Sequence, residues 1–311
     1  MNEWGAVVPT ASDAPGGLNH AERSGRRLRF TGLMRFLTAL FLTVSTFAAE
    51  PVVTRNQFYT KAKDKQQALD VHAPAEGEKH PVIVWIHGGG WKAGDKASLQ
   101  KKPQAFLEKG FVLVSVNYRL VPTVTLKEMM SDLAQSVRWV RDHVAEHRGD
   151  PERIVIMGHS AGAHLAALLC TDDRYLKAAG VPMSCLKGCV PLDVSAYDIP
   201  KRLKEGGDTP AVNYTSVFGT TEAEQREFSP AVYVARDKGI PPFLLLHVAS
   251  RESTKTQAHW LASKLQEAGV NARVIAAEGK THGTISSDLG GPEDPPTLEL
   301  WKFLDQVVPR S

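Results

Sequence analysis

The sequence predicts an α/β fold, with a mainly parallel sheet that is covered by helices on both faces. Three largely apolar runs, residues 81–86, 111–116 and 243–248, are typical of strands buried on both faces. Residues 126–147 form a longer amphipathic segment whose apolar side chains recur with helical spacing. Because such segments alternate along the chain, we expect the strands to lie parallel in one sheet.

The remaining elements follow from the same patterns. Further strands are expected at 66–72, 154–157, 190–192 and 272–277, and further helices at 98–109, 161–170, 256–267 and 297–307. The run 66–72 alternates polar and apolar side chains, which is typical of an edge strand. Residues 195–241 follow neither pattern and contain charged residues, Gly and Pro, so we expect a lid or binding loop there.

Composition and charge exclude several classes of protein. The 311 residues are 42% hydrophobic and 23% charged, which is ordinary for a globular protein and excludes disordered, collagen-like and coiled-coil chains. The formal net charge is +3, and two of these charges come from the first 48 residues. The remainder is nearly neutral, so no nucleic acid partner is expected.

The cysteines and histidines indicate no metal site. Cys170, Cys185 and Cys189 are too few for a disulfide scaffold, and no Cys or His group has the spacing of zinc ligands. No metal or organic cofactor is therefore expected. Two interpretations of the cysteines remain open: buried thiols, or one disulfide with one free thiol.

Residues 1–49 are typical of a targeting segment. Met34 and a following Arg precede a short apolar run, 36–49, that ends in small residues as a secretory signal peptide does. The 33 residues before Met34 are too many for the start of such a peptide, so we expect translation to begin at Met34 and cleavage to follow Ala48. An uncleaved anchor is the alternative, although the run is shorter than the ~20 residues that span a bilayer. The remaining domain, 50–311, is expected to be secreted or periplasmic, without a stable membrane anchor.

The motif Gly158-His159-Ser160-Ala161-Gly162 predicts a nucleophile. It lies between an expected strand and an expected helix, where a sharp turn exposes a serine hydroxyl. The glycines on either side of the serine remove side chains that would clash at this turn. We therefore expect Ser160 to be the nucleophile, rather than part of an incidental glycine turn.

A second motif, His87-Gly88-Gly89-Gly90-Trp91, directly follows the buried strand 81–86. Backbone N–H groups of such a loop can point at a substrate oxygen. We expect Gly88 and Gly89, together with Ala161 after the serine, to form an oxyanion hole. A plain flexible loop is the alternative.

The general base is expected to be His282, in a polar loop just after the strand 272–277. A histidine that follows the serine and the acid along the chain suits this position. His159 and His164 flank the serine but face elsewhere on the turn and helix, and His87 is expected to be structural.

Together these motifs resemble the alpha/beta-hydrolase superfamily, in particular its hormone-sensitive-lipase-like branch of esterases. Residues 91–96 (WKAGDK), 116–120 (VNYRL) and 158–164 (GHSAGAH) more closely resemble carboxylesterases grouped with feruloyl esterases and kynurenine formamidases. The resemblance covers residues 70–308. It implies an alpha/beta-hydrolase fold, with a short lid at 195–241, and a Ser–acid–His mechanism.

The acid is where the sequence departs from this family. The family places an aspartate in the loop after the strand 243–248, and by alignment that position is Ser250. Glu252 is the only carboxylate in the loop, and we expect it to serve as the acid. Two alternatives stay open: Asp193, at the end of the preceding strand, and a site without a functional acid.

The sequence thus predicts a serine hydrolase that cleaves small or aryl carboxylic esters through an acyl-enzyme intermediate on Ser160. The expected partner is a small-molecule ester. Amidase or formamidase-type hydrolysis is the first alternative, and a scaffold or binding protein with an impaired triad is the second. The sequence predicts no oligomeric state.

Overall fold

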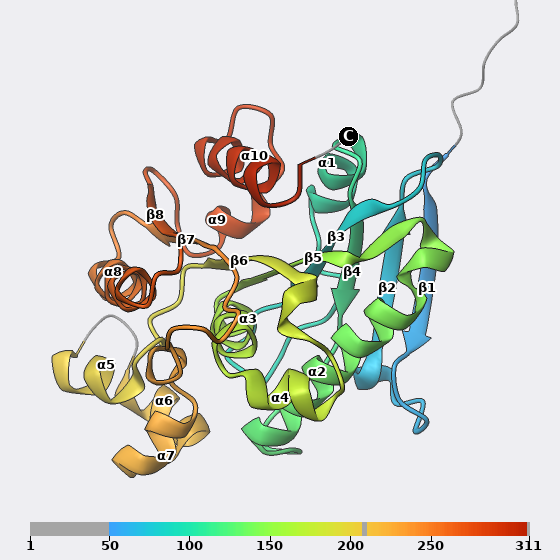
Figure 1. Cartoon of the computed structure of the whole chain (residues 1–311). Helices are drawn as coiled ribbons and strands as arrows, with labels where there is room; N and C mark the ends of the chain where they lie inside the picture. Colours follow the sequence, from blue (N-terminus) through green and yellow to red (C-terminus); the bar gives the residue numbers. More distant parts are fainter. Residues whose placement is uncertain (1–49, 207–209, 310–311) are drawn as a thin grey trace, which may run out of the picture. The chain divides into compact units, whose positions relative to one another are not determined.

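The computed structural model describes residues 50–206 and 210–309, which are built around one eight-stranded sheet (Figure 1). The strand order is β1-β2-β4-β3-β5-β6-β7-β8. The two pairs that involve β2 are antiparallel and all the others are parallel, so the sheet is mainly parallel, as predicted. The strands are β1 (Val52–Phe58), β2 (Ala68–Ala73), β3 (His80–Ile86), β4 (Val112–Val116), β5 (Gly149–His159), β6 (Leu186–Leu192), β7 (Phe243–Val248) and β8 (Ala272–Ala277).

One strand differs from the expectation. The run 66–72 was expected at the edge of the sheet, but β2 pairs with β1 on one side and β4 on the other, and all its residues are buried. The edge strand on this side of the sheet is β1, whose residues are mostly exposed and which shows no clear alternation. The polar residues of β2 gave it the alternating pattern of an edge strand, but they are buried instead of facing solvent. The carboxylate of Asp70, for example, forms an ion pair with Lys96 at 2.7 Å.

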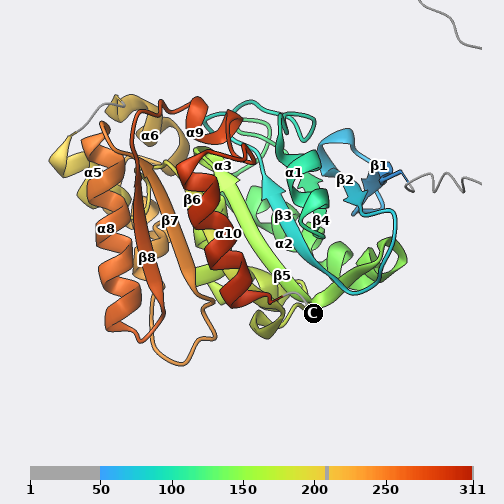
Figure 2. The same cartoon turned by 90° about the horizontal axis from the view of Figure 1, so that it is seen from above.

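Helices cover both faces of the sheet (Figure 2). Helices α2, α3 and α8 contribute to the apolar core on one face, and α1 and α10 contribute to the core on the other. Strand β3 shows how the sheet divides these cores, because Val84 faces the first and its neighbours Ile83 and Trp85 face the second. The helices are α1 (Lys102–Glu108), α2 (Leu126–His143), α3 (Ala161–Thr171), α4 (Asp173–Ala178), α5 (Ile199–Glu205), α6 (Ala211–Phe218), α7 (Glu222–Glu227), α8 (Glu252–Glu267), α9 (Thr284–Ser287) and α10 (Pro295–Val307).

The described parts of the region 195–241 contain three short helices, α5, α6 and α7. Each has at most eight residues, too few for a helical period to stand out in the sequence. Tyr214 and Phe218 on α6 are buried, and both ring systems lie edge-on to Trp91 at the end of the glycine loop. The region is therefore packed against the motif that precedes α1.

Three further expectations concern the cysteines, the absence of a membrane anchor and the N-terminal signal peptide. The three cysteines are buried and none forms a disulfide, so the first of the two interpretations is the one observed. Among the described helices, none combines the length and the apolar character that a membrane crossing requires. The expected signal peptide, 1–49, and the expected start at Met34 lie outside the described residues.

Candidate active site

Ser160 lies at the sharp turn between β5 and α3. Its φ of 56° and ψ of −123° are rare for a residue with a side chain, and its N–H donates to the carbonyl of Leu192 on β6 at 2.9 Å. Close packing explains the flanking glycines: a Cβ on Gly158 would come within 2.3 Å of the carbonyl oxygen of Gly162. A Cβ on Gly162 would come within 2.2 Å of the carbonyl oxygen of Ile86. The turn expected from the motif is therefore formed.

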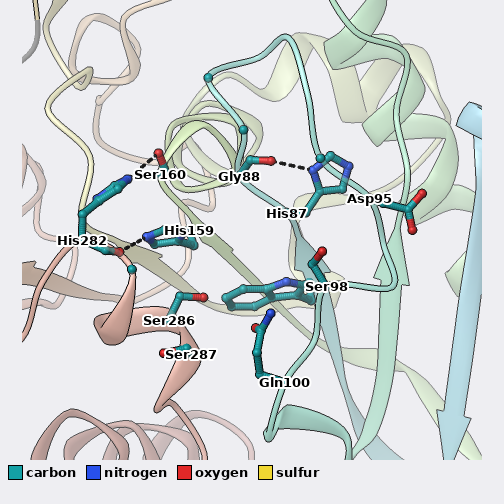
Figure 3. A pocket seen from close by; sticks show the side chains of 15 residues that line it. His87, Gly88, Asp95, Ser98, Gln100, His159, Ser160, His282, Ser286 and Ser287 are labelled. Carbon is teal, nitrogen blue, oxygen red and sulfur yellow. Dashed lines mark hydrogen bonds between the residues drawn. The ribbon is translucent and has the colours of Figure 1, made fainter.

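The hydroxyl of Ser160 faces the imidazole of His282, and Oγ and Nε2 are 3.0 Å apart (Figure 3). His282 lies in the loop between β8 and α9. His159 supports this loop, because its Nε2 donates to the carbonyl oxygen of His282 at 2.7 Å (Figure 3). Burial and the neighbouring His282 lower the pKa of His159 to about 4, which keeps its ring neutral at neutral pH.

On its other side, His282 contacts Asp193. The Nδ1 of His282 and the Oδ2 of Asp193 are 2.7 Å apart, and the carboxylate is fully buried. The second oxygen, Oδ1, accepts from the N–H of Val248 at 2.9 Å. Burial by itself would raise the pKa of Asp193, but the bonds from His282 and Val248 and the charge of Arg251 outweigh it and hold the pKa well below its usual range. Asp193 is therefore a carboxylate whose two oxygens both have partners.

The structure does not bring Glu252 to His282, so the expectation that this residue supplies the acid is wrong. Glu252 is the first residue of α8, its side chain is 77% exposed, and it pairs with Lys255 at 3.2 Å. Ser250 is exposed as well. The residue of this loop that does reach His282 is Arg251, whose guanidinium lies next to Nδ1 of His282 and also forms an ion pair with Asp193. The carboxylate beside His282 is thus that of Asp193, which the sequence left open as an alternative because it directly follows the preceding strand.

The glycine loop lies beside Ser160. A Cβ on Gly88 would be 2.8 Å from the carbonyl oxygen of His159 and 3.1 Å from the Cβ of Ser160, so a glycine is needed for this close approach. Gly89 and Gly90 have φ values of 127° and 59°, which turn the loop back on itself. Ala161 begins α3, and first-turn N–H groups have no acceptor within their own helix. Of the three expected donors, Gly88 and Ala161 thus lie directly beside Ser160, and Gly89 lines the same cavity; their role as donors stays a prediction.

Side chains around the loop hold it in place. The hydroxyl of Tyr118 donates to the carbonyl oxygen of His87 at 2.7 Å, and the two rings stack with centroids 4.5 Å apart. The indole N–H of Trp91 donates to Nδ1 of His164 at 3.2 Å. His164 is fully buried, and its Nε2 donates to the carbonyl oxygen of Phe228 at 2.7 Å. The glycine loop is therefore tied to both the sheet and the lid region.

Two cavities meet at Ser160. The first, of about 480 Å³, is lined on its far side by polar side chains (Figure 3): Ser98, Gln100, Ser286 and Ser287. The second, of about 400 Å³, is lined by Trp91, Asn213, Tyr214 and Arg251, among others. Such a pair of cavities can accept the two halves of a substrate whose reacting carbon lies at the serine. Among the described residues, no group of three or more His, Cys, Asp or Glu side chains is arranged to hold a metal ion.

Comparisons with known proteins agree with this fold. A probable isoprenylcysteine alpha-carbonyl methylesterase of Arabidopsis thaliana is 31% identical over 255 residues, which cover 75% of this chain and 51% of the relative. The chain thus spans about half the length of the curated relatives it matches.

Solved structures agree as well. A truncated carbohydrate esterase from gut microbiota, with 20% identity and a TM-score of 0.69, matches 83% of this chain and 96% of its own length. An esterase of Thermogutta terrifontis, with 25% identity and a TM-score of 0.62, matches 85% of this chain and 94% of its own length. The fold is that of an alpha/beta-hydrolase. Since the BD-FAE family model matches residues 69–265, well over half of the sequence, the chain belongs to the BD-FAE family.

Proposed function

We propose that this protein is a serine hydrolase that cleaves carboxylic esters. The observation that carries the proposal is the continuous chain of contacts from Ser160 Oγ to His282 Nε2 at 3.0 Å, and from His282 Nδ1 to Asp193 Oδ2 at 2.7 Å. A nucleophile, a base and a buried carboxylate in this order are what covalent acyl transfer requires. The names of the relatives, which are esterases, support the same reaction class.

The reaction proceeds in two halves. Ser160 Oγ attacks the ester carbonyl carbon while His282 Nε2 takes the hydroxyl proton, and the N–H groups of Gly88, Gly89 and Ala161 stabilise the oxyanion. The tetrahedral intermediate collapses as His282 passes the proton to the leaving alcohol, which leaves an acyl group on Ser160. Water, deprotonated by His282, then attacks this acyl group, and His282 returns the proton to Ser160 Oγ as the carboxylic acid is released. Asp193 orients the imidazole and stabilises its charged form throughout.

The proposed substrate is a small or aryl ester. The two cavities at Ser160 have volumes of about 480 and 400 Å³, which suits a compact group on each side of the scissile bond. The polar lining of the first cavity favours a hydroxyl-bearing or otherwise polar group there, rather than a long alkyl chain. The alternative of a scaffold with an impaired triad depended on the missing aspartate at position 250, and Asp193 removes that argument.

The test uses the purified protein, a fluorophosphonate probe and 4-nitrophenyl acetate. We expect one covalent adduct on Ser160, and we expect Ser160→Ala to lose both the adduct and the hydrolysis. Ser184→Ala, which removes the hydroxyl of an exposed serine that lines neither cavity, is the matched control and should keep both. Hydrolysis that survives in Ser160→Ala would refute the proposal. Turnover of formanilide at a rate above that of the aryl acetate would instead favour the amidase alternative.

A further inference from the structure

Arg251 occupies an unusual place for a cation, directly beside the acid and the base. Its guanidinium nitrogen bonds Oδ2 of Asp193, the same oxygen that His282 Nδ1 contacts. That nitrogen also lies 2.8 Å from His282 Nδ1. The Arg251 side chain is 20% exposed, so solvent screens this charge only in part.

These contacts constrain the proton on His282. A proton on Nδ1 can be donated to Asp193, and it leaves the lone pair on Nε2 free to accept from Ser160. A lone pair on Nδ1 could accept from Arg251, but it would then face the carboxylate oxygen at 2.7 Å, which is repulsive. Asp193 is held as the carboxylate, so the first, productive arrangement is favoured and the guanidinium faces an N–H group.

Asp193 is the charged group that opposes this cation at the ring of His282, and the other described neighbours of the ring do not. Asp193 at the end of β6 and Arg251 before α8 face the ring from one side, and His159 at the end of β5 packs against it with ring centroids 4.5 Å apart. In the loop of His282 itself, Lys280 is paired with Asp288 and Asp294. Two charged groups, one of each sign, therefore dominate the field at the imidazole.

We propose that Arg251 is a positioning residue of the triad: it fixes the carboxylate of Asp193, and its positive charge opposes the imidazolium form that Asp193 favours, so that the reaction extends to lower pH than it would without this charge. The first effect comes from its bond to Oδ2, and the second from its positive charge. This inference rests on the proposed function, since it concerns the pH range of the same reaction. A cation beside the base also makes the base weaker, so the acid tolerance comes with a slower proton transfer.

The experiment compares pH profiles of kcat/KM for 4-nitrophenyl acetate in four proteins. Arg251→Gln keeps an N–H group for Asp193 but removes the charge, and Arg251→Lys keeps the charge. Arg273→Gln is the matched control, because it breaks an arginine–carboxylate pair, with Glu299, at a partly exposed site on β8 that lines neither cavity. Arg251→Met, which also lacks the charge, serves if Arg251→Gln does not fold.

We expect the acid limb of the profile to move to higher pH by about one unit in Arg251→Gln, a shift in line with one partly screened charge at this distance. Arg251→Lys should keep the limb of the parent protein, and Arg273→Gln should change nothing. The alkaline plateau of Arg251→Gln should equal or exceed that of the parent. An unmoved limb in Arg251→Gln, or equal shifts in the Gln and Lys variants, would overturn the proposal.

A second measurement separates this inference from the proposed function. The titration of His282 can be followed by NMR with isotope-labelled histidine, which needs neither substrate nor turnover. Its midpoint should rise in Arg251→Gln and stay in place in Arg251→Lys. A protein that shows this pattern but hydrolyses no ester would refute the proposed function alone. A protein that hydrolyses esters and shows no difference in midpoint between the parent and Arg251→Gln would refute the inference alone.

Discussion

Asp193 and His282 touch at 2.7 Å although 89 residues separate them along the chain. Asp193 directly follows β6 and His282 follows β8, and only β7 lies between these two strands in the sheet. Because the three strands are parallel, their carboxyl ends lie at one edge, where side chains from separate loops can meet. The loop after β7, which lies between them, contributes Arg251 instead of an acid.

The first prediction concerns this acid. Asp193→Asn should lower kcat by about 10²–10⁴, because the amide favours the wrong tautomer of His282 and cannot stabilise its charged form. Steady-state kinetics with 4-nitrophenyl acetate measures the loss, and circular dichroism tests whether the fold is intact. Glu252→Gln is the matched control, since it removes a carboxylate near the same site that is exposed and bonded only to Lys255 in the described contacts, and should leave kcat unchanged. Full activity in folded Asp193→Asn would contradict the assignment.

The serine turn and the glycine loop could be predicted from sequence because local chemistry fixes them. A residue at φ 56° between a strand and a helix needs glycines nearby, and those glycines are visible in the motif. The proposed acid could not be predicted in this way, since Asp193 and Glu252 follow neighbouring strands and either loop could reach His282 at the same edge. The position at which α8 begins decides between the two carboxylates, because Glu252 is its first residue and its side chain is exposed. Helix ends are the least certain part of a sequence-based assignment.

The same limit explains the other differences. Strand β1 was missed because its exposed residues carry no alternating pattern, and helices α5 to α7 were missed because each is too short to show a period. The strands β7 and β8, in contrast, match the expected ranges at both ends. Of the two edge strands, β8 was therefore predicted and β1 was not, because only the residues of β8 form an apolar run.

The second prediction concerns Gly162, whose position leaves no room for a side chain. A Cβ there would come within 2.2 Å of the Ile86 carbonyl oxygen and 2.5 Å of that of His87, and both are backbone atoms. Gly162→Ala should therefore lower the free energy of unfolding by about 1–3 kcal/mol and reduce activity by shifting the glycine loop. Urea unfolding measures the first effect, and ester hydrolysis the second.

A matched glycine in the same site serves as the control. Gly283 has a φ of −76°, and the nearest atom to an added Cβ is 3.9 Å away, so alanine fits there. Gly283→Ala should be neutral or stabilise the protein by up to about 1 kcal/mol. Equal losses of stability in the two variants would argue against close packing at Gly162 as the cause.

The third prediction concerns export. We propose that the apolar run 36–49 directs secretion and that the mature protein begins at Ala49, because Thr46 and Ala48 place small residues where a signal peptidase requires them. Intact-mass measurement of the exported protein tests this. A mature form that retains residues 36–47 would contradict it, and so would the absence of the protein from the exported fraction.

The last prediction concerns the acid stability of the link between the glycine loop and the lid region. Buried His164 accepts from Trp91 through Nδ1 and donates to Phe228 through Nε2, which requires a neutral ring. Burial lowers the pKa of His164 to about 4, and the bond to Phe228 offsets this only in part. In the unfolded chain a histidine has a pKa near 6.5.

Between these two values the unfolded state binds a proton that the folded state does not, so stability should fall as the pH drops through this window. The loss attributable to His164 is roughly 3 kcal/mol once the pH is below about 4, where both states are protonated and the effect ends. His159 has a lowered pKa in the same range, so the parent protein should lose stability through both residues. His164→Gln isolates one of them, because glutamine can accept and donate without titrating.

Urea unfolding at several pH values across the window measures the effect. His164→Gln should be less stable than the parent at neutral pH, since its bonds to Trp91 and Phe228 fit less well, and this difference should shrink or reverse as the pH falls. The comparison cancels the titration of all carboxylates and of His159, which both proteins share. If the two proteins lost stability in parallel, His164 would be protonated in the folded state at the same pH as in the unfolded chain, and its bond from Trp91 could not be the neutral-ring contact described above.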